Sequence, residues 1–392
     1  MKYFTFKQTV FSVTVLSSCL GVTIPVSAAD SLQQAFSSGK ADINMRYRYE
    51  TVKAGSIDGN ASTLRTRLGF TTGDYNNLKA RIDLEYVNTG GNYDDANPRP
   101  TIADPQLEEL NQAWIDYTGI DKTSIKVGRQ RIILDNARFV GNVGWRQAEQ
   151  TFDAITITNK SFGDTTITFS NISQINTITG GEVNTSHNIF NVGVDKTPIG
   201  KVSAYAYVID NDAPDSTSDI TTLGARLKDA KDNLLYTLEY AQQSDSGDST
   251  ADFSPTYTFL EAGYKMGDTK VFLAQETLGS DNGVGFSTPL ATKHAFNGWA
   301  DQFLGTPGSG LTDLYLKAVT KVAGMKLVGV YHDFSADTGS TDFGTELDLL
   351  LVKPINKNMK ALIKFSDFDA DASGGKTDTQ KIWLALEARF SQ

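Results

Sequence analysis

Apolar and polar residues alternate along many short segments of this chain. In the segment 41–50, apolar residues occupy every second position and polar or charged residues lie between them, and segments 64–70 and 78–87 repeat this pattern. Successive side chains of a β-strand point to opposite sides, so a period of two predicts strands with one apolar and one polar face. The apolar positions include Ile43, Met45, Tyr47, Tyr49, Leu64, Leu68, Phe70, Leu78, Ile82, Leu84 and Tyr86.

The links between these segments alternate in length. Short links such as 121–123 and 231–233 are followed by longer ones such as 91–109 and 281–310, and about 18 strands fit between them. The pattern predicts an all-β fold: a transmembrane antiparallel β-barrel of about 18 strands, with short periplasmic turns and long extracellular loops. A secreted β-sandwich would also alternate, but so many strands with a charged face do not suit two packed sheets.

The first residues have the composition of a secretory signal peptide. Two lysines precede an apolar run, and small residues lead to a cleavage position after Ala28. We expect residues 1–28 to be the signal peptide and residues 29–392 to form one barrel domain. The alternative is a lipoprotein lipidated at Cys19, the single cysteine of the chain.

Charge and histidine content argue against several classes of protein. The net charge is −10, and loss of the two signal-peptide lysines makes it −12. Such an acidic chain is not expected to bind nucleic acid. The three histidines, His187, His294 and His332, stand in no recognisable Ser/His/Asn constellation, so we expect no enzymatic activity. We also expect no cofactor and no metal site.

Arginine is concentrated in the first five predicted strands and recurs in the last, which would close against the first. Guanidinium groups on one arc of the inner wall could bind an anion and relay it, or they could pair with carboxylates of neighbouring strands and hold the wall rigid. The candidate pore-lining cations of the strands are Arg46, Arg48, Arg65, Arg67, Lys79, Arg81, Lys126, Arg129, Arg131 and Arg389. The candidate counter-charges are Glu50, Asp83, Glu85 and Asp116.

One long link differs in composition from the others. The link 135–151 carries Arg138 and Arg146 together with Phe139 and Trp145, whereas most other long links are acidic and rich in Ser and Gly. Exposed aromatic side chains are poorly solvated, so we expect this link to fold inward as a constriction loop. Phe139 and Trp145 would anchor it to the wall, and Arg138 and Arg146 would line the pore. The alternative is an outer loop whose aromatic residues cover the barrel rim.

A series of short motifs runs through this loop and the ends of the strands beside it. They are Gly128-Arg129-Gln130-Arg131, Asp135-Asn136, Arg138-Phe139, Trp145-Arg146-Gln147 and Gln150-Thr151-Phe152-Asp153-Ala154. In these motifs the chain resembles the alginate export family of bacterial outer-membrane barrels. The resemblance implies a monomeric 18-stranded barrel with an arginine-rich conduit for an anionic polysaccharide.

The expected function is therefore an outer-membrane channel of a Gram-negative bacterium that conducts or exports an anionic, alginate-like polysaccharide or oligosaccharide. The alternatives are a porin for small nutrients, an outer-membrane enzyme and a plugged adhesin barrel. The link 281–310, rich in aromatic residues, is assigned to a long extracellular loop and could be a lid, a plug or a partner surface. The expected partners are an anionic saccharide or another small anion, outer-membrane lipid and lipopolysaccharide, and the barrel assembly machinery.

Overall fold

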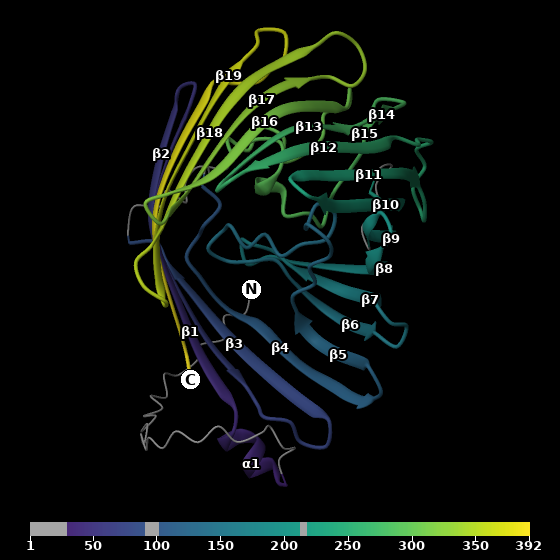
Figure 1. The fold of residues 1–392 in the computed structure, drawn as a ribbon, viewed down its shortest axis with the longest axis vertical. Helices are drawn as coiled ribbons and strands as arrows, with labels where there is room; N and C mark the ends of the chain where they lie inside the picture. Colours follow the sequence, from purple (N-terminus) through teal and green to yellow (C-terminus); the bar gives the residue numbers. More distant parts are fainter. Residues whose placement is uncertain (1–29, 91–101, 212–217) are drawn as a thin grey trace, which may run out of the picture.

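The computed structural model describes residues 30–90, 102–211 and 218–392. Its main element is a closed sheet of 18 antiparallel strands, in which β1 pairs with both β2 and β20 (Figure 1). The predicted barrel is therefore confirmed. Its strands are β1 (Lys40–Ala54), β2 (Ile57–Thr71), β3 (Leu78–Asn88), β4 (Leu107–Ile120), β5 (Thr123–Gln130), β6 (Thr151–Asn159), β7 (Thr165–Asn176), β8 (Glu182–Thr197), β9 (Gly200–Ile209), β10 (Ile220–Lys231), β11 (Leu234–Asp245), β12 (Thr256–Met266), β13 (Thr269–Leu278), β16 (Leu311–Val322), β17 (Met325–Ser335), β18 (Asp342–Pro354), β19 (Met359–Ala370) and β20 (Thr379–Ser391).

Few other elements are present in the described ranges. Helix α1 (Leu32–Ser37) precedes the barrel, the hairpin of β14 (Ser280–Asp281) and β15 (Val284–Gly285) follows β13, and a single 3-10 turn, η1, covers Lys293–Ala295. Among the described residues, none of the helical segments is long and apolar enough to cross a membrane.

The outer face of the barrel is apolar, as the alternation predicts. Leu68, Leu84, Leu260 and Leu316 are each about half exposed, at 49 to 54%. A soluble protein would bury such a band, whereas a transmembrane barrel presents it to lipid. The short turns at one end of the barrel are tight because residues such as Asp232 (φ 56°) and Gly267 (φ 59°) adopt left-handed backbone conformations.

Two links fold into the interior of the barrel (Figure 1). The constriction loop, residues 131–150, joins β5 to β6, and the inner segment, residues 286–306, follows β15. Phe286 and Phe303 of the inner segment are 0 and 7% exposed. The assignment of the whole link 281–310 to an extracellular loop is thus wrong, because most of its apolar side chains find cover inside the barrel rather than at its rim.

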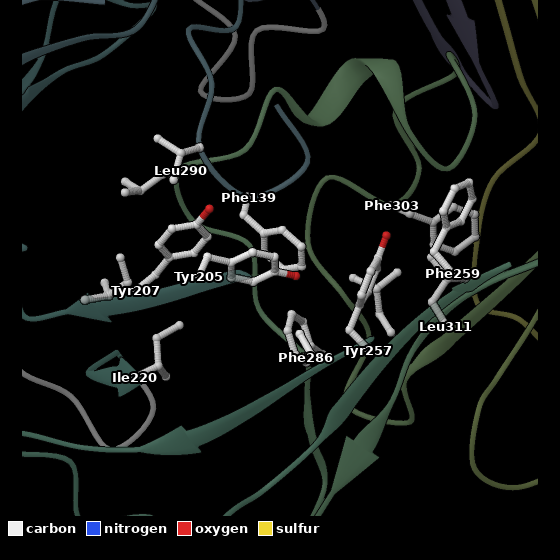
Figure 2. Packing of buried hydrophobic residues seen from close by; sticks show 14 of the residues in the cluster. Phe139, Tyr205, Tyr207, Ile220, Tyr257, Phe259, Phe286, Leu290, Phe303 and Leu311 are labelled. Carbon is white, nitrogen blue, oxygen red and sulfur yellow. The ribbon is translucent and has the colours of Figure 1, made fainter. Parts of the chain in front are cut away.

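Inward-facing aromatic side chains provide that cover. Phe139 of the constriction loop lies 5.2 Å from Tyr205 of β9, 5.1 Å from Tyr257 of β12 and 5.9 Å from Phe286, measured between ring centroids (Figure 2). Phe303 packs in the same way on wall residues Phe334, Phe343 and Phe368. The barrel therefore has an apolar core inside its lumen, in addition to the polar wall.

Candidate functional site: an arginine-lined lumen with an inner diaphragm

The constriction loop and the inner segment are bonded directly to each other. The backbone N–H of Gly141 donates to the carbonyl of Leu290, and that of Thr292 donates to the carbonyl of Ala137, both at 2.9 Å. The N–H of Val143 donates to the Thr292 hydroxyl at 3.1 Å. These bonds join the two segments into one structure, which we call the inner diaphragm.

Carboxylates of β18 accept hydrogen bonds from the inner segment of the diaphragm. The backbone N–H of Ala300 donates to Glu346 at 2.7 Å, and the N–H of Trp299 donates to Asp348 at 3.1 Å. On β20, the Lys381 ammonium lies 2.7 Å from the Asp301 carboxylate. The diaphragm is therefore attached to several strands around the barrel and crosses its interior.

Arginines of β1 and β2 hold the constriction loop, which is the other part of the diaphragm. Their guanidinium groups donate hydrogen bonds to backbone carbonyls of the constriction loop, so the barrel wall is bonded to the main chain of the loop. Arg46 donates to Gly144 and Arg146, Arg48 to Trp145, and both Arg65 and Arg67 to Gln147. A carbonyl is an uncharged acceptor, so these bonds leave the positive charges uncompensated.

Most of the wall arginines also have a carboxylate partner. Arg48 pairs with Asp104 at 3.2 Å, Arg67 pairs with Glu85 and with Glu149, and Arg81 pairs with Asp42 and Asp83, both at 2.8 Å. Arg46 and Arg65 are different: in the part of the chain that the structure describes, neither has a carboxylate within ion-pair distance.

Arg46 and Arg65 lie directly opposite each other on β1 and β2 and are 6 and 2% exposed. The Nε of Arg65 also lacks a hydrogen-bond acceptor. Two adjacent buried cations without a carboxylate in direct contact are costly, because burial removes the water that would stabilise them. The hydrogen bonds of the two guanidinium groups go to neutral acceptors, which are Gln147, Gly144 and Arg146 for Arg46 and Gln147 and Asn44 for Arg65.

A cavity of about 320 Å³ opens beside this pair, between the constriction loop and the short-turn end of the barrel. We call it the arginine cavity. Its charged lining consists of six arginines and three carboxylates, so cations are in excess. These side chains are Arg46, Arg65, Arg67, Arg81, Arg131, Arg389, Asp42, Asp83 and Glu149.

Glu149 is the main acidic anchor of the constriction loop. It is 2% exposed, lies 3.1 Å from Arg67, pairs with Arg131, and accepts a hydrogen bond from Asn111 at 2.7 Å. Burial acts to raise the pKa of Glu149, but the charges of Arg67 and Arg131 outweigh burial and lower the pKa to about 2. Sequence reasoning missed this residue, because nothing in its spacing distinguishes it from a solvated loop acid.

The lowered pKa predicts that acid releases the loop. Because the pKa of Glu149 falls from 4.5 to about 2 on folding, its contribution of about 3 kcal/mol is complete above pH 4.5 and is lost as the pH falls to about 2. Single-channel recordings at pH 6, 4 and 2.5 should show current fluctuations that increase only at the lower values. Glu149→Gln should fluctuate at every pH, and a pH-independent wild type would contradict this anchor.

Arg138 and Arg146 of the constriction loop do not project freely into the lumen, although the sequence pattern predicted that they would line the pore. Arg138 is 2% exposed and pairs with Glu276 at 2.7 Å, and Arg146 is 6% exposed and pairs with Glu50 at 3.2 Å and Asp301 at 3.1 Å. Burial acts to lower the pKa of each guanidinium, but these carboxylates outweigh it and raise the pKa. Both arginines therefore fasten the diaphragm, since a buried guanidinium requires carboxylate partners.

Trp145 of the constriction loop contacts both the inner segment and the barrel wall. Its ring stacks on His294 of the inner segment at 4.8 Å and meets Trp383 of β20 edge-on at 5.8 Å. The guanidinium of Arg48 lies 4.3 Å and the ammonium of Lys364 lies 4.1 Å from the ring centroid. Burial lowers the pKa of His294 well below its ordinary value, so the stacked imidazole is neutral. The structure thus places Trp145 and Phe139 at positions where each holds the loop to its surroundings.

The remaining predicted cations lie away from the diaphragm or at its edge. Arg131 and Arg389 line the arginine cavity, Lys126 lies over the Trp114 ring at 4.5 Å, and Lys79 is exposed near the start of β3. Among the predicted counter-charges, Asp116 accepts a hydrogen bond from Ser124 at 2.5 Å. It forms no ion pair with an arginine among the described residues.

Arg129 was assigned to the pore, and the structure corrects this assignment. Arg129 shares a strand face with Val127, which is 49% exposed on the outside of the wall. Its guanidinium pairs with Asp153 at 2.8 Å and Glu182 at 3.4 Å. The motif that contains Arg129 changes direction after β5, so Arg131 turns inward while Arg129 stays on the outer face.

The closed barrel, its apolar outer band and its charged lumen together define a channel of the bacterial outer membrane. The chain belongs to the alginate export family, whose sequence profile matches residues 40–271. The sequence matches no curated protein.

Solved outer-membrane proteins share the fold at low sequence identity. OccAB4 of Acinetobacter baumannii is 12% identical, with a TM-score of 0.71 over 91% of this chain and 98% of its own. OpdK of Pseudomonas aeruginosa is 10% identical, with a TM-score of 0.72 over 91% of this chain and 100% of its own. OccK9 (OpdG) of the same organism is 12% identical, with a TM-score of 0.69 over the same shares. At such identities the likeness concerns the fold alone.

Proposed function

We propose that this outer-membrane channel passes carboxylated solutes, and that its cargo is an acidic oligosaccharide or polysaccharide such as a polyuronate. The observation that carries the proposal is the buried pair Arg46 and Arg65, which has no carboxylate partner among the described residues and borders a cavity rich in arginine. A guanidinium binds a carboxylate through two parallel hydrogen bonds. Membership of the alginate export family supports the same class of cargo.

Binding of a carboxylate would also weaken the hold on the constriction loop. Arg46 and Arg65 now donate to the carbonyls of Gly144 and Gln147, both at 3.1 Å. A charged carboxylate is a stronger acceptor than a carbonyl, so an entering solute competes for the same donors. In this proposal the arginines both select the solute and hold the constriction until the solute arrives. The transport is passive, is carried out by a single chain, and involves no enzymatic activity.

A second candidate function is a porin for small nutrients. One observation favours it: several lumen arginines, among them Arg81 and Arg138, are already paired with carboxylates. Paired charges select weakly, because their field is largely cancelled at a distance. The two functions differ in whether the channel distinguishes anions from other solutes of the same size.

Bilayer electrophysiology tests the proposal. The purified protein is inserted in a planar bilayer under a potassium chloride gradient, and the reversal potential gives the ratio of chloride to potassium permeability. We expect a preference for chloride, and current blockades by a trimeric uronate at concentrations where a neutral trisaccharide has little effect on chloride flow. A preference for potassium, or indifference to the uronate, would overturn the anion proposal and leave the small-nutrient porin.

A further inference from the structure

A second cavity, of about 250 Å³, lies inside the barrel between the inner segment and the wall formed by β10 to β17. It shares none of its lining with the arginine cavity. Five aromatic rings contribute to this lining, so we call it the aromatic cavity. The rings belong to Tyr257, Phe259, Phe296, Trp299 and Tyr315.

The aromatic cavity is balanced in charge. The cations Arg226 and Lys317 are matched by the carboxylates of Glu261 and Glu276 in its lining. Lys317 lies 3.1 Å from Glu261, and Glu276 is neutralised by Arg138 at 2.7 Å. Arg226 pairs in turn with Glu239 on the neighbouring strand. A solute with a net charge would therefore find no unmatched partner here, in contrast to the arginine cavity.

Polar groups are interleaved with the rings. Glu261 is half-buried and accepts from Lys317, and the Tyr315 hydroxyl is within 3.5 Å of the same carboxylate oxygen. The Asn297 side chain and His332 also reach the lining. A purely apolar ligand would remove water from these groups without replacing its hydrogen bonds, which is unfavourable. The lining instead suits a ligand with an apolar face and several hydroxyl groups.

An uncharged pyranose has these properties: its C–H faces pack on aromatic rings, and its hydroxyls donate to carboxylates and amides. The volume of the cavity is slightly below the range of pockets for drug-sized ligands, so it suits one sugar ring better than several. We propose that the aromatic cavity is a second binding site, for a neutral pyranose unit, separate from the site for carboxylates. This inference goes beyond the proposed function and does not depend on the charge selectivity of the channel.

Intrinsic fluorescence tests the site, because Trp299 lines it. The folded barrel in detergent micelles is titrated with maltotriose, a neutral saccharide, and with a trimeric uronate. We expect saturable quenching by maltotriose. Tyr315→Leu, which removes a ring from the lining, should weaken this binding about tenfold, and Tyr315→Phe, which keeps the ring, should bind nearly as wild type. The altered electrophoretic mobility of the folded barrel on heating verifies that each variant is folded.

The variant Arg46→Gln/Arg65→Gln separates the two sites. We expect it to bind maltotriose as the wild type does and to lose affinity for the uronate. Absence of saturable quenching by maltotriose, or its loss in the double arginine variant, would overturn the pyranose site. Binding of the uronate alone, weakened equally by Tyr315→Leu and by the arginine changes, would also overturn it and would show that both cavities belong to one path for anions. None of these results alters the reversal-potential test of the proposed function.

Discussion

Replacing both Arg46 and Arg65 with glutamine should abolish most of the preference of the channel for anions. These two wall arginines have no carboxylate within ion-pair distance among the described residues. A hydrogen bond to a charged group contributes about 1.5–3 kcal/mol, so affinity for a trimeric uronate should fall at least about tenfold. The chloride to potassium permeability ratio, measured from reversal potentials, should move towards one. Glutamine retains an N–H donor for the loop carbonyls, so the constriction should remain in place.

A control is available on the outer face of the barrel. Arg129→Gln removes one positive charge, compared with two in the double variant, and its guanidinium pairs with Asp153 outside the wall. We expect its permeability ratio and uronate blockades to equal those of the wild type. Equal effects of the lumen and outer variants would mean that net charge, and not the arginine pair, sets selectivity.

Phe139→Ala should release the constriction loop and raise single-channel conductance. Phe139 is 8% exposed and packs against Tyr205, Tyr257 and Phe286. Removal of a buried phenylalanine ring costs about 3–5 kcal/mol, and this cost falls on the contact that joins the loop to both the wall and the inner segment. We expect larger and noisier currents, with passage of solutes that the wild type excludes.

Phe169→Ala is the corresponding control, because Phe169 is 37% exposed on the outer face and has no part in the diaphragm. It should conduct as the wild type does. If Phe139→Ala also conducts as the wild type, the hydrogen bonds from Arg46, Arg48 and Arg65 suffice to hold the loop, and the aromatic contact is not its anchor.

The barrel was predictable from the sequence because its signal is local and repeated. Alternation along segments such as 41–50 places Arg46 and Arg48 on one face and Met45 and Tyr47 on the other, and the structure keeps those faces. Lipid requires an apolar outer face along every strand, so the period of two recurs around the whole barrel.

The partners of the charged side chains were less predictable. Asp104 and Glu149 lie far along the chain from the arginines of β1 and β2 that they contact, and no period connects them. Asp301 meets Arg146 only because two links fold into the same space. Alternation also failed at Arg131, which it would place on the outer face with Val127 and Arg129: the chain leaves β5 after Gln130, and Arg131 turns inward to pair with Glu149.

Composition and alternation along the chain thus established the barrel, its approximate strand count, its outer-membrane location and the arc that carries the arginines, because each of these follows from what lipid and water demand of individual strands. The inner diaphragm, the unpaired state of Arg46 and Arg65 and the aromatic cavity required the folded structure. Each of them arises where segments distant in sequence meet inside the barrel. Whether a charged or apolar side chain of one segment finds a partner depends on which side chains the other segment places beside it.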